Sequence, residues 1–428
     1  PLLTELGERF TRAGHELALV GGPVRDAFLG RTSPDLDFTT DAQPDEILRI
    51  IRGWADAHWE IGRAFGTIGA RKGEAIVEIT TYRTDAYDRE TRKPQVAFGD
   101  SLSADLVRRD FTVNAMALRL PSLEFVDEHD GLADLAARRL RTPAAPEASF
   151  ADDPLRMMRA ARFASQLGLT FAPEVYAAMV ARADTLAMVS AERIRDEFTK
   201  LLLSDAPRAG LTLLVDSGLA EVFLPELPAL RLEVDEHHRH KDVYEHSLTV
   251  LEQAIALEGR VPEGVRALAQ ARAAGGDDDG DDPAYPVVAG PDLVLRLAAL
   301  LHDIGKPATR RFEQGGGVSF HHHELVGARM VAKRLRAMRF DKDTGRDVAR
   351  LVELHLRFHG YGEGQWTDSA VRRYVTDAGP LLGRLHLLTR SDCTTRNARK
   401  AARLARTYDE LEVRIARLAA EEIGRAHV

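Results

Sequence analysis

The pattern of apolar residues changes near residue 147, and this change constrains the fold more than any other feature of the sequence. Before it, short apolar runs such as Leu17 to Val20 and Ala75 to Thr81 suit strands, and amphipathic segments lie between them. After it come long segments rich in Ala, Leu and Arg at helical spacing, beginning with Asp153 to Leu167. The sequence therefore predicts an α+β N-terminal region followed by an all-α remainder.

Length and composition narrow the class of protein. At about 150 residues per domain, a chain of 428 residues suggests roughly three domains. With 44% hydrophobic and 29% charged residues, and no apolar run near the roughly 20 residues that cross a bilayer, the composition excludes a disordered chain and a membrane span. The single cysteine, Cys393, cannot form an internal disulfide, so we expect a cytoplasmic location.

The net charge is −8, from 58 basic and 66 acidic residues. Taken alone, this balance argues against a nucleic-acid partner, because a phosphate backbone binds to net positive surface. An RNA partner would therefore have to bind through local basic patches and metal ions rather than through the field of the whole molecule.

The densest group of polar residues lies in the segment LVGGPVRDAFLGRTSPDLDF, residues 19 to 38. A strand that runs into Gly21 and Gly22 and then into a helix lets the backbone approach a phosphate closely, with free N–H groups aimed at it. Arg25, one helical turn later, can add a charged fork. The segment therefore predicts a phosphate-binding turn.

Two aspartates follow this turn. Asp35 and Asp37 are one residue apart, so both carboxylates point to the same face if residues 35 to 38 are extended. Two carboxylates on one face can hold the divalent ions that a phosphoryl transfer uses, and Glu78 on the Ala75 to Thr81 strand is a candidate third. A Gly-Gly turn or an Asp-x-Asp pair alone is more often structural, but their combination at this spacing favours a catalytic site.

A further candidate lies in the segment DDPLRMMRAARF, residues 152 to 163. A carboxylate beside a guanidinium offers acceptors and donors in a plane, and such a pair can hydrogen-bond to the edge of a base. The alternative is that the charged residues of this segment form ordinary salt bridges along one face of a helix. Four charged residues recur every three positions along one stripe of the predicted helix: Asp153, Arg156, Arg159 and Arg162.

These segments, together with VRRDFTVNAMA at residues 107 to 117 and DGLADL at residues 130 to 135, resemble the class II CCA-adding tRNA nucleotidyltransferases and the related bacterial poly(A) polymerases. The resemblance covers about residues 15 to 230. It implies a polymerase-β-like nucleotidyltransferase head, in which a mixed sheet with helices carries the site, followed by all-α neck, HD and tail domains.

The same resemblance implies roles for single residues. Asp35 and Asp37 would bind Mg²⁺, and Asp153 with Arg156 would read the base of the incoming CTP or ATP. The family usually has Glu-Asp where this chain has Asp152 and Asp153. The residues that the resemblance assigns to nucleotide binding are Gly21, Gly22, Arg25, Arg109, Asp110, Asn114, Asp153, Arg156, Arg159 and Arg162.

The distal half carries histidines and aspartates in a different series. This series resembles the HD phosphohydrolase superfamily, in which such ligands bind a metal that activates water for attack on phosphate. The resemblance implies a divalent transition metal or Mg²⁺ and leaves room for a second ion, but hydrolysis stays open, because ligands can persist where catalysis is not used. The predicted ligands are His246 in DVYEHSL, His302 and Asp303 in LLHDIGK, His323 in HHHELVGA, His355 in LVELHLRFHG and Asp392 in RSDCTT.

The motifs predict four domains. The acidic stretch GGDDDGDDP, residues 275–283, falls between His246 and His302, so we expect it to be a loop inserted into the HD domain. The basic residues after Asp392 fit a solvated helix better than an RNA contact. The expected domains are a nucleotidyltransferase head at 1–146, a helical neck for base recognition and RNA binding at 147–230, an HD domain at 231–395, and a helical tail at 396–428 that we expect to be truncated.

The expected reaction is stepwise addition of C, C and A to the 3′ acceptor end of tRNA from CTP and ATP, with release of pyrophosphate. Poly(A) polymerases and enzymes that add only CC or only A share these motifs. Ala64 in the segment IGRAFGTIGA stands where the poly(A) polymerases carry a second basic residue, which favours CCA addition. In another alternative, a metal-dependent phosphatase or phosphodiesterase in the HD half is the main activity. The oligomeric state stays open.

Overall fold

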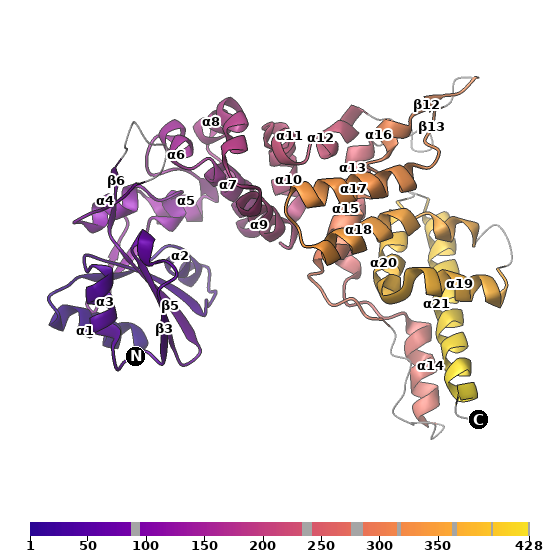
Figure 1. Cartoon of the computed structure of the whole chain (residues 1–428), viewed down its shortest axis with the longest axis horizontal. Coiled ribbons are helices and arrows are strands. Elements are labelled where there is room, and N and C mark those ends of the chain that lie inside the picture. Colours follow the sequence, from indigo (N-terminus) through magenta and orange to yellow (C-terminus); the bar gives the residue numbers. More distant parts are fainter. Residues whose placement is uncertain are drawn as a thin grey trace. The chain divides into compact units, whose positions relative to one another are not determined.

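The structure, a computed structural model, describes residues 1–86, 95–232, 242–274, 286–314, 318–361, 366–394 and 397–426 (Figure 1). The chain forms two compact units. Unit 1 comprises Pro1–Ala160 and Leu167–Thr185, and unit 2 comprises Ala161–Gln166 and Leu186–Val428. The expected α+β head followed by helices is confirmed, because the large sheet lies within unit 1 and long helices dominate the rest.

Three expectations have different outcomes. The acidic stretch at 275–283 lies outside the described residues, and the four domain boundaries stay predictions. Within the described part of the chain, no helix is both long enough and apolar enough to cross a bilayer. The cytoplasmic location also stays a prediction.

The sheet of unit 1 has seven strands in the order β3-β4-β5-β2-β1-β8-β9. Neighbouring strands are antiparallel except β2 and β5, which run in parallel. The strands are β1 (Leu17–Val20), β2 (Asp35–Thr40), β3 (Ala57–Trp59), β4 (Thr67–Lys72), β5 (Ala75–Thr81), β8 (Ala117–Leu120) and β9 (Glu124–Val126). Two small pairs accompany it, β6 (Arg83–Ala86) with β7 (Gln95–Phe98), and β10 (Arg139–Leu140) with β11 (Thr170–Phe171).

The helices of unit 1 connect and cover these strands. Helix α7 begins in unit 1 and passes through residues of unit 2. The helices are α1 (Leu2–Arg12), α2 (Gly22–Phe28), α3 (Pro44–Ile51), α4 (Leu102–Val107), α5 (Gly131–Ala136), α6 (Pro146–Asp152), α7 (Leu155–Leu167) and α8 (Pro173–Arg182), with short 3₁₀ turns η1 (Arg63–Phe65), η2 (Thr112–Asn114) and η3 (Ala183–Met188).

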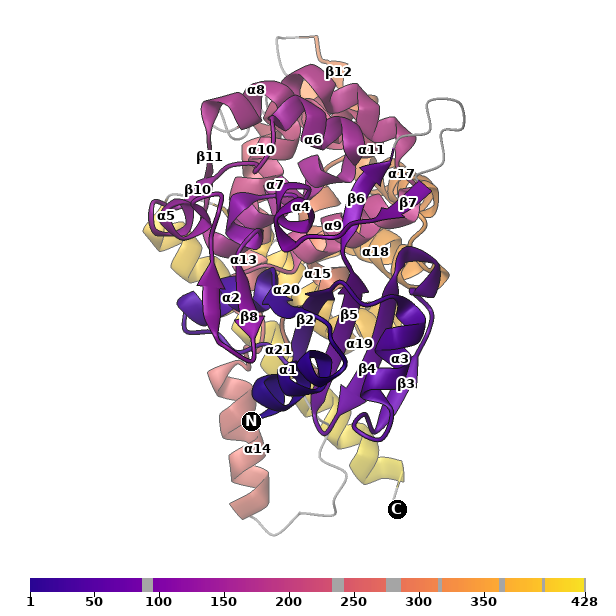
Figure 2. The ribbon, with the colours of Figure 1, turned by 90° about the vertical axis from the view of Figure 1, so that its left-hand side faces the viewer.

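Alternation along β5 separates a core face from a polar face. Val77 and Ile79 are fully buried in one cluster with Phe10 of α1 and Ile47 of α3, and Figure 2 shows α1 in front of the strands. A fully buried side chain such as Phe10 contributes about 2–3 kcal/mol by its removal from water. Glu78, between the two buried residues, points to the opposite face and is exposed. The core on one side therefore fixes which side chains β5 offers on the other.

Unit 2 is built from helices, with one short hairpin in its described part, β12 (Arg311–Phe312) with β13 (Val318–Ser319). Its helices are α9 (Ala191–Leu202), α10 (Pro207–Asp216), α11 (Leu219–Phe223), α12 (Glu226–Ala229), α13 (Val243–Leu257), α14 (Glu263–Ala274), α15 (Leu293–Leu301), α16 (Lys306–Thr309), α17 (His323–Ala337), α18 (Lys342–Leu354), α19 (Asp368–Ala378), α20 (Leu382–Asp392) and α21 (Ala398–Ala426). The 3₁₀ turns are η4 (Leu230–Leu232), η6 (Arg357–Gly360) and η7 (Gly379–Leu381).

One buried arginine joins three helices of unit 2. Arg296 of α15 is 2% exposed and contacts Glu258, directly after α13, through two hydrogen bonds of 2.8 Å. It also donates to the carbonyls of Leu202 and Ser204 at 2.9 and 2.7 Å, which satisfies carbonyl groups left open where α9 ends. These bonds hold α13 and α15 in a fixed relation, and both helices lead to predicted metal ligands.

Candidate functional site

Three carboxylates share the polar face of the sheet in unit 1. Asp35 and Asp37 alternate with Leu36 along β2, so both lie on one face, as the Asp-x-Asp spacing predicts. The parallel register places Asp37 directly beside Glu78 of β5. Loss of surrounding water and then the charges of Glu78 and Asp35 raise the pKa of Asp37, and Arg109 opposes this rise. The negative charge of the three carboxylates thus exceeds the positive charge that Arg109 supplies.

The glycine turn lies against a cation of this site. Gly21 follows β1 with a φ of +72°, a conformation that glycine adopts without strain. A Cβ on Gly21 would lie 3.3 Å from Nη1 of Arg109, which Asp105 of α4 holds through a 3.1 Å hydrogen bond from Nη2. The N–H of Gly21 donates to the Met116 carbonyl at 3.4 Å, so this N–H is used inside the protein. The glycine therefore lets the backbone of the turn lie close to the Arg109 guanidinium.

Four residues predicted to bind nucleotide form a chain of hydrogen bonds. Arg25 Nη1 donates to Asn114 Oδ1 at 2.6 Å, and Asn114 Nδ2 donates to Asp110 Oδ1 at 3.1 Å. Nε and Nη2 of Arg159 both donate to Asp110 Oδ2, at 2.8 and 2.6 Å. Although burial opposes it, Arg159 then lowers the pKa of Asp110. This chain connects α2, the η2 turn and α7.

The predicted stripe of four charged residues on one helix is wrong. Helix α6 ends at Asp152, and Asp153 has extended backbone, φ −145° and ψ 101°, because a residue before proline avoids the helical region. Helix α7 begins only at Leu155, whose N–H donates to Asp153 Oδ1 at 3.1 Å. Asp153 therefore lies in front of the helix that carries Arg156, Arg159 and Arg162.

Neighbouring groups hold Arg156 in place. Its Nη1 donates to Ser149 Oγ at 2.9 Å and to the Ser149 carbonyl at 3.3 Å, and Nη2 donates to the Arg108 carbonyl at 2.7 Å. A guanidinium has five N–H donors, so these bonds leave donors for a further partner. Burial lowers the pKa of Arg156, while Asp110 and Asp153 raise it. Asp153 and Arg156 are thus close enough for their charges to interact.

Arg162 has different surroundings from the other predicted nucleotide-binding residues. It belongs to unit 2, where Nε donates to Glu197 Oε2 of α9 at 2.6 Å and Nη1 donates to Gln166 at 3.1 Å. Its side chain is 11% exposed. Nucleotide binding by Arg162 stays a prediction, but these contacts serve the packing of α7 against α9.

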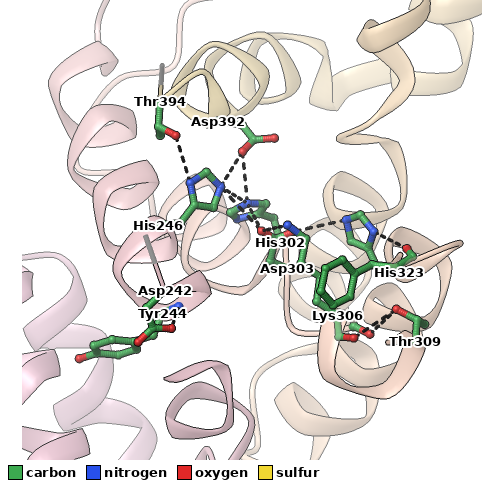
Figure 3. A network of polar contacts seen from close by, with 12 residues as sticks. Asp242, Tyr244, His246, His302, Asp303, Lys306, Thr309, His323, Asp392 and Thr394 are labelled. Carbon is green, nitrogen blue, oxygen red and sulfur yellow. Dashed lines mark hydrogen bonds and ion pairs between the residues drawn. The ribbon is translucent and has the colours of Figure 1, made fainter. Parts of the chain in front are cut away.

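All six predicted HD ligands converge in unit 2, where His246 of α13 and Asp392 at the end of α20 meet the His302–Asp303 pair after α15 (Figure 3). His246 Nε2 lies 2.9 Å from Asp392 Oδ1 and 3.3 Å from Nε2 of His302. His323 Nε2 lies 3.3 Å from Asp303 Oδ1. The geometry yields two groups that can each hold a metal ion: His246, His302 and Asp392; and Asp303, His323 and His355.

The imidazoles are oriented as in metal sites. Nδ1 of His302, His323 and His355 each lies within 2.9 Å of the carbonyl three residues earlier, and Thr394 Oγ1 contacts Nδ1 of His246 at 3.2 Å. Such contacts on one ring nitrogen aim the other at a metal. Nε2 of His355 is buried and has no hydrogen-bond partner in the described part of the chain. A buried unpaired nitrogen is unfavourable unless a ligand occupies it.

The charge of this cluster also favours a cation. Burial alone lowers the pKa of His302, but Asp303 and Asp392 outweigh it and raise the pKa to about 10. Burial lowers the pKa of His355 to about 4, so this ring is neutral. The carboxylates of Asp303 and Asp392, one buried and one partly buried, thus draw a proton onto one histidine, and Lys306 Nζ lies 3.0 Å from Asp303 Oδ2. A metal ion would supply the positive charge instead.

Sequence reasoning missed the residues that hold the predicted ones in place. Asp134 is fully buried and accepts hydrogen bonds from Thr112 at 2.6 Å and from Arg141 at 2.9 Å, which fixes the η2 turn that carries Asn114. Asp105 was also missed, although it stands four residues before Arg109, a spacing that signals an ion pair on one helical face.

Known protein families match both the region of the three carboxylates and the region of the histidine cluster. A model described as the poly(A) polymerase head domain matches residues 17–141. Residues 17–141 are thus similar to the head domain of poly(A) polymerases. A model described as a probable RNA- and SrmB-binding site of polymerase A matches residues 168–230 beyond this head domain, and an HD domain model matches residues 243–419. The resemblance predicted from the sequence is confirmed.

Two curated relatives illustrate how far the similarity extends. The CCA-adding enzyme of Levilactobacillus brevis is 43% identical over 209 residues, 49% of this chain and 51% of the relative. The CCA-adding enzyme of Bacillus subtilis is 41% identical over 217 residues, 50% of this chain and 52% of the relative. The chain spans about half the length of the curated relatives that it matches.

Solved structures extend the likeness of fold beyond the head domain. A Bacillus stearothermophilus CCA-adding enzyme in complex with CTP aligns over 95% of this chain and 81% of its own, with a TM-score of 0.60 at 24% identity. A tRNA nucleotidyltransferase complexed with a primer tRNA and an incoming ATP analog aligns over 99% of both chains, with a TM-score of 0.60 at 19% identity. At these identities the likeness concerns the fold.

Proposed function

We propose that the chain adds C, C and A in turn to the 3′ end of tRNA, with CTP and ATP as substrates and pyrophosphate as the leaving product. The observation that carries this proposal is the shared face of Asp35, Asp37 and Glu78, with Arg109 and the Gly21 turn beside it. The names of the relatives, CCA-adding enzymes, support the same reaction.

The three carboxylates fit Mg²⁺. Hard oxygen ligands are the ones that Mg²⁺ prefers. Burial and then the charges of Glu78 and Asp35 raise the pKa of Asp37, and a bound cation would counter both effects. In this proposal Asp35 and Asp37 hold the metal, with Glu78 beside them. The metal would supply two effects, a lower pKa of the attacking 3′-hydroxyl and neutralisation of phosphate charge.

The remaining predicted residues bind and orient the nucleotide in this proposal. Arg109, fixed by Asp105, contributes positive charge next to Asp37 for the triphosphate. Asp153 and Arg156 read the base, since the bonds to Ser149 orient the guanidinium before a nucleotide arrives and leave donors for a base edge.

The test uses tRNA that lacks its CCA end, with labelled CTP and ATP offered separately and together. We expect incorporation to stop after two C and one A. Long A tails would instead identify a poly(A) polymerase, and C alone or A alone a partial enzyme. Asp35→Ala should abolish incorporation and His302→Ala should leave it intact; the opposite pattern would move the activity to unit 2.

We further propose a metal-dependent phosphohydrolase activity at the cluster around His302. The two ligand groups, the buried unpaired Nε2 of His355 and the four imidazoles favour a divalent transition metal over Mg²⁺. A metal bound here would activate water for attack on phosphate. Metal analysis of the purified wild type should show a bound transition metal. The variant His355→Ala should contain less of this metal and should no longer hydrolyse bis(p-nitrophenyl) phosphate. Equal metal content in both proteins would refute the site.

A further inference from the structure

Helices α17 and α18 line a groove of about 920 Å³ on unit 2, and none of the residues that line it belongs to the two centres described above. Figure 1 shows where these two helices lie. The helices follow one another along the chain and are joined by residues 338–341. The residues that line the groove are Leu325, Ala328, Arg329, Ala332, Arg336, Phe340, Asp341, Lys342, Gly345, Arg346, Ala349, Arg350 and Glu353.

The floor of the groove is apolar because both helices place small residues there. Ala328 and Ala332 of α17 are four residues apart, as are Gly345 and Ala349 of α18, so each pair lies on one helical face. A Cβ placed on Gly345 would meet no other atom within 4 Å. The hollow therefore follows from the short side chains, and Phe340 adds one half-buried aromatic ring.

The rims of the groove are basic. Arg329 and Arg336 of α17 and Lys342, Arg346 and Arg350 of α18 line it, against Asp341 and Glu353, so cations outnumber acids five to two. Carboxylates neutralise part of this charge, because Arg346 pairs with Asp343 and Asp347, and Arg350 with Glu353.

The uncompensated charge lies where the two helices meet. Arg336, near the end of α17, and Lys342, at the start of α18, are exposed and have no acidic partner among the residues that the structure describes. Arg329 donates from Nε to the Leu325 carbonyl of its own helix, which leaves its charge unbalanced. In a chain of net charge −8, this is a local positive surface.

We propose that this groove binds a sugar–phosphate strand of the RNA substrate. Arginine and lysine on both rims match phosphate groups, and an uncharged floor with an aromatic ring accepts ribose and base faces, as in grooves that follow a nucleic-acid backbone. The inference rests on the proposed function for the identity of the RNA, tRNA. It assigns to unit 2 a part in holding that RNA.

The experiment measures binding of tRNA lacking CCA to the full-length chain at several salt concentrations. The variant Arg336→Glu/Lys342→Glu reverses two groove charges. The control Lys333→Glu/Arg266→Glu makes the same change in net charge at two exposed residues of unit 2 that do not line the groove. Thermal melting of both variants checks that they fold.

The groove variant should bind tRNA at least about tenfold more weakly than the control at low salt. Its plot of log affinity against log salt should also be less steep by about 1.4 to 1.8, because each of the two lost phosphate contacts removes about 0.7 to 0.9 from the slope. Equal affinity and slope in the two variants would overturn the proposal. So would an acidic amphipathic peptide that binds the wild type and not the groove variant while tRNA affinity stays unchanged.

This measurement does not depend on nucleotide addition. If the wild type binds tRNA but incorporates neither C nor A, the proposed function fails and the groove is still tested. If incorporation occurs as expected and the groove variant binds tRNA like the control, only the groove proposal fails.

Discussion

Removal of Arg159 should destabilise unit 1, because it leaves the Asp110 carboxylate buried without its cation. Asp110 is 8% exposed, and two N–H groups of Arg159 reach its Oδ2. Breaking a buried ion pair from one side costs about 3–5 kcal/mol. The Arg159 side chain is 32% exposed, so solvent screening reduces this to about 2–3 kcal/mol for Arg159→Gln.

The assay is urea and thermal unfolding followed by tryptophan fluorescence. Trp54 and Trp59 lie in unit 1 and Trp366 in unit 2, so a Trp366→Phe background restricts the signal to unit 1. At about 2–4 °C per kcal/mol, the melting temperature of Arg159→Gln should fall by about 4–12 °C. Arg12→Gln, at an arginine with a 73% exposed side chain, is the control and should shift stability by less than about 0.5 kcal/mol.

A double-mutant cycle decides whether the ion pair is the cause. Asp110→Asn removes the negative charge that pairs with Arg159. In that background Arg159→Gln should therefore lower the free energy of unfolding only slightly, and the coupling energy between the two positions should be about 2 kcal/mol. The same cycle should show a raised KM for nucleotide in Arg159→Gln, since Asp110 orients Asn114 and through it Arg25. Additive effects of the two substitutions would refute the reasoning.

Three further predictions concern other parts of the chain. Gly21→Ala should lower stability by about 1–2 kcal/mol and weaken nucleotide binding, whereas Gly14→Ala, with φ +81° and no atom within 4 Å, should lower stability alone; equal effects on nucleotide binding would contradict the role of the Arg109 contact. Burial lowers the pKa of His386 from 6.5 to about 4, so the unfolded chain binds more protons between these values and stability should fall by about 3 kcal/mol as the pH drops through this window. His386→Asn should flatten that dependence in denaturant titrations at pH 7.5 and 4.5, and the exposed His58→Asn should not. Chelation should lower the melting temperature of unit 2 in the wild type and leave His355→Ala unchanged; an equal drop in both would speak against metal at His355.

Local patterns predicted those parts of the site that depend on one segment. The Asp-x-Asp spacing requires only that β2 is extended, and it is. The position of Glu78 beside Asp37 requires in addition that β2 and β5 pair in parallel and in one register, which no local pattern of either segment specifies. The Asp153 stripe failed because Pro154 interrupts the helix, and that signal was present in the sequence.

The HD cluster shows the same division between local and tertiary information. The resemblance of the six ligands and their order to the HD superfamily predicted that they converge, and each motif contributes its own ligand. The hydrogen bonds that orient the rings follow from where helices α15 and α18 end, since His302 and His355 each contact the carbonyl three residues earlier at those ends. The sequence therefore indicates which residues are ligands, whereas the orientation of their rings depends on where the helices end in the structure.

The net charge of −8 is a poor guide to partners in this chain because it does not distinguish charges that are paired inside the protein from unpaired charges at the surface. Asp134 contacts Arg139 and Arg141, Asp110 contacts Arg159, and Glu258 contacts Arg296, so these carboxylates contribute little field at the surface. Each such pair adds zero to the sum of −8, so the sum does not say where the unpaired charges of the chain lie. A surface whose cations lack such partners, as at Arg336 and Lys342, stays positive at short range, and at a Debye length of about 8 Å only short-range charge reaches a bound strand. RNA affinity should therefore follow the charge of the groove and not that of the chain.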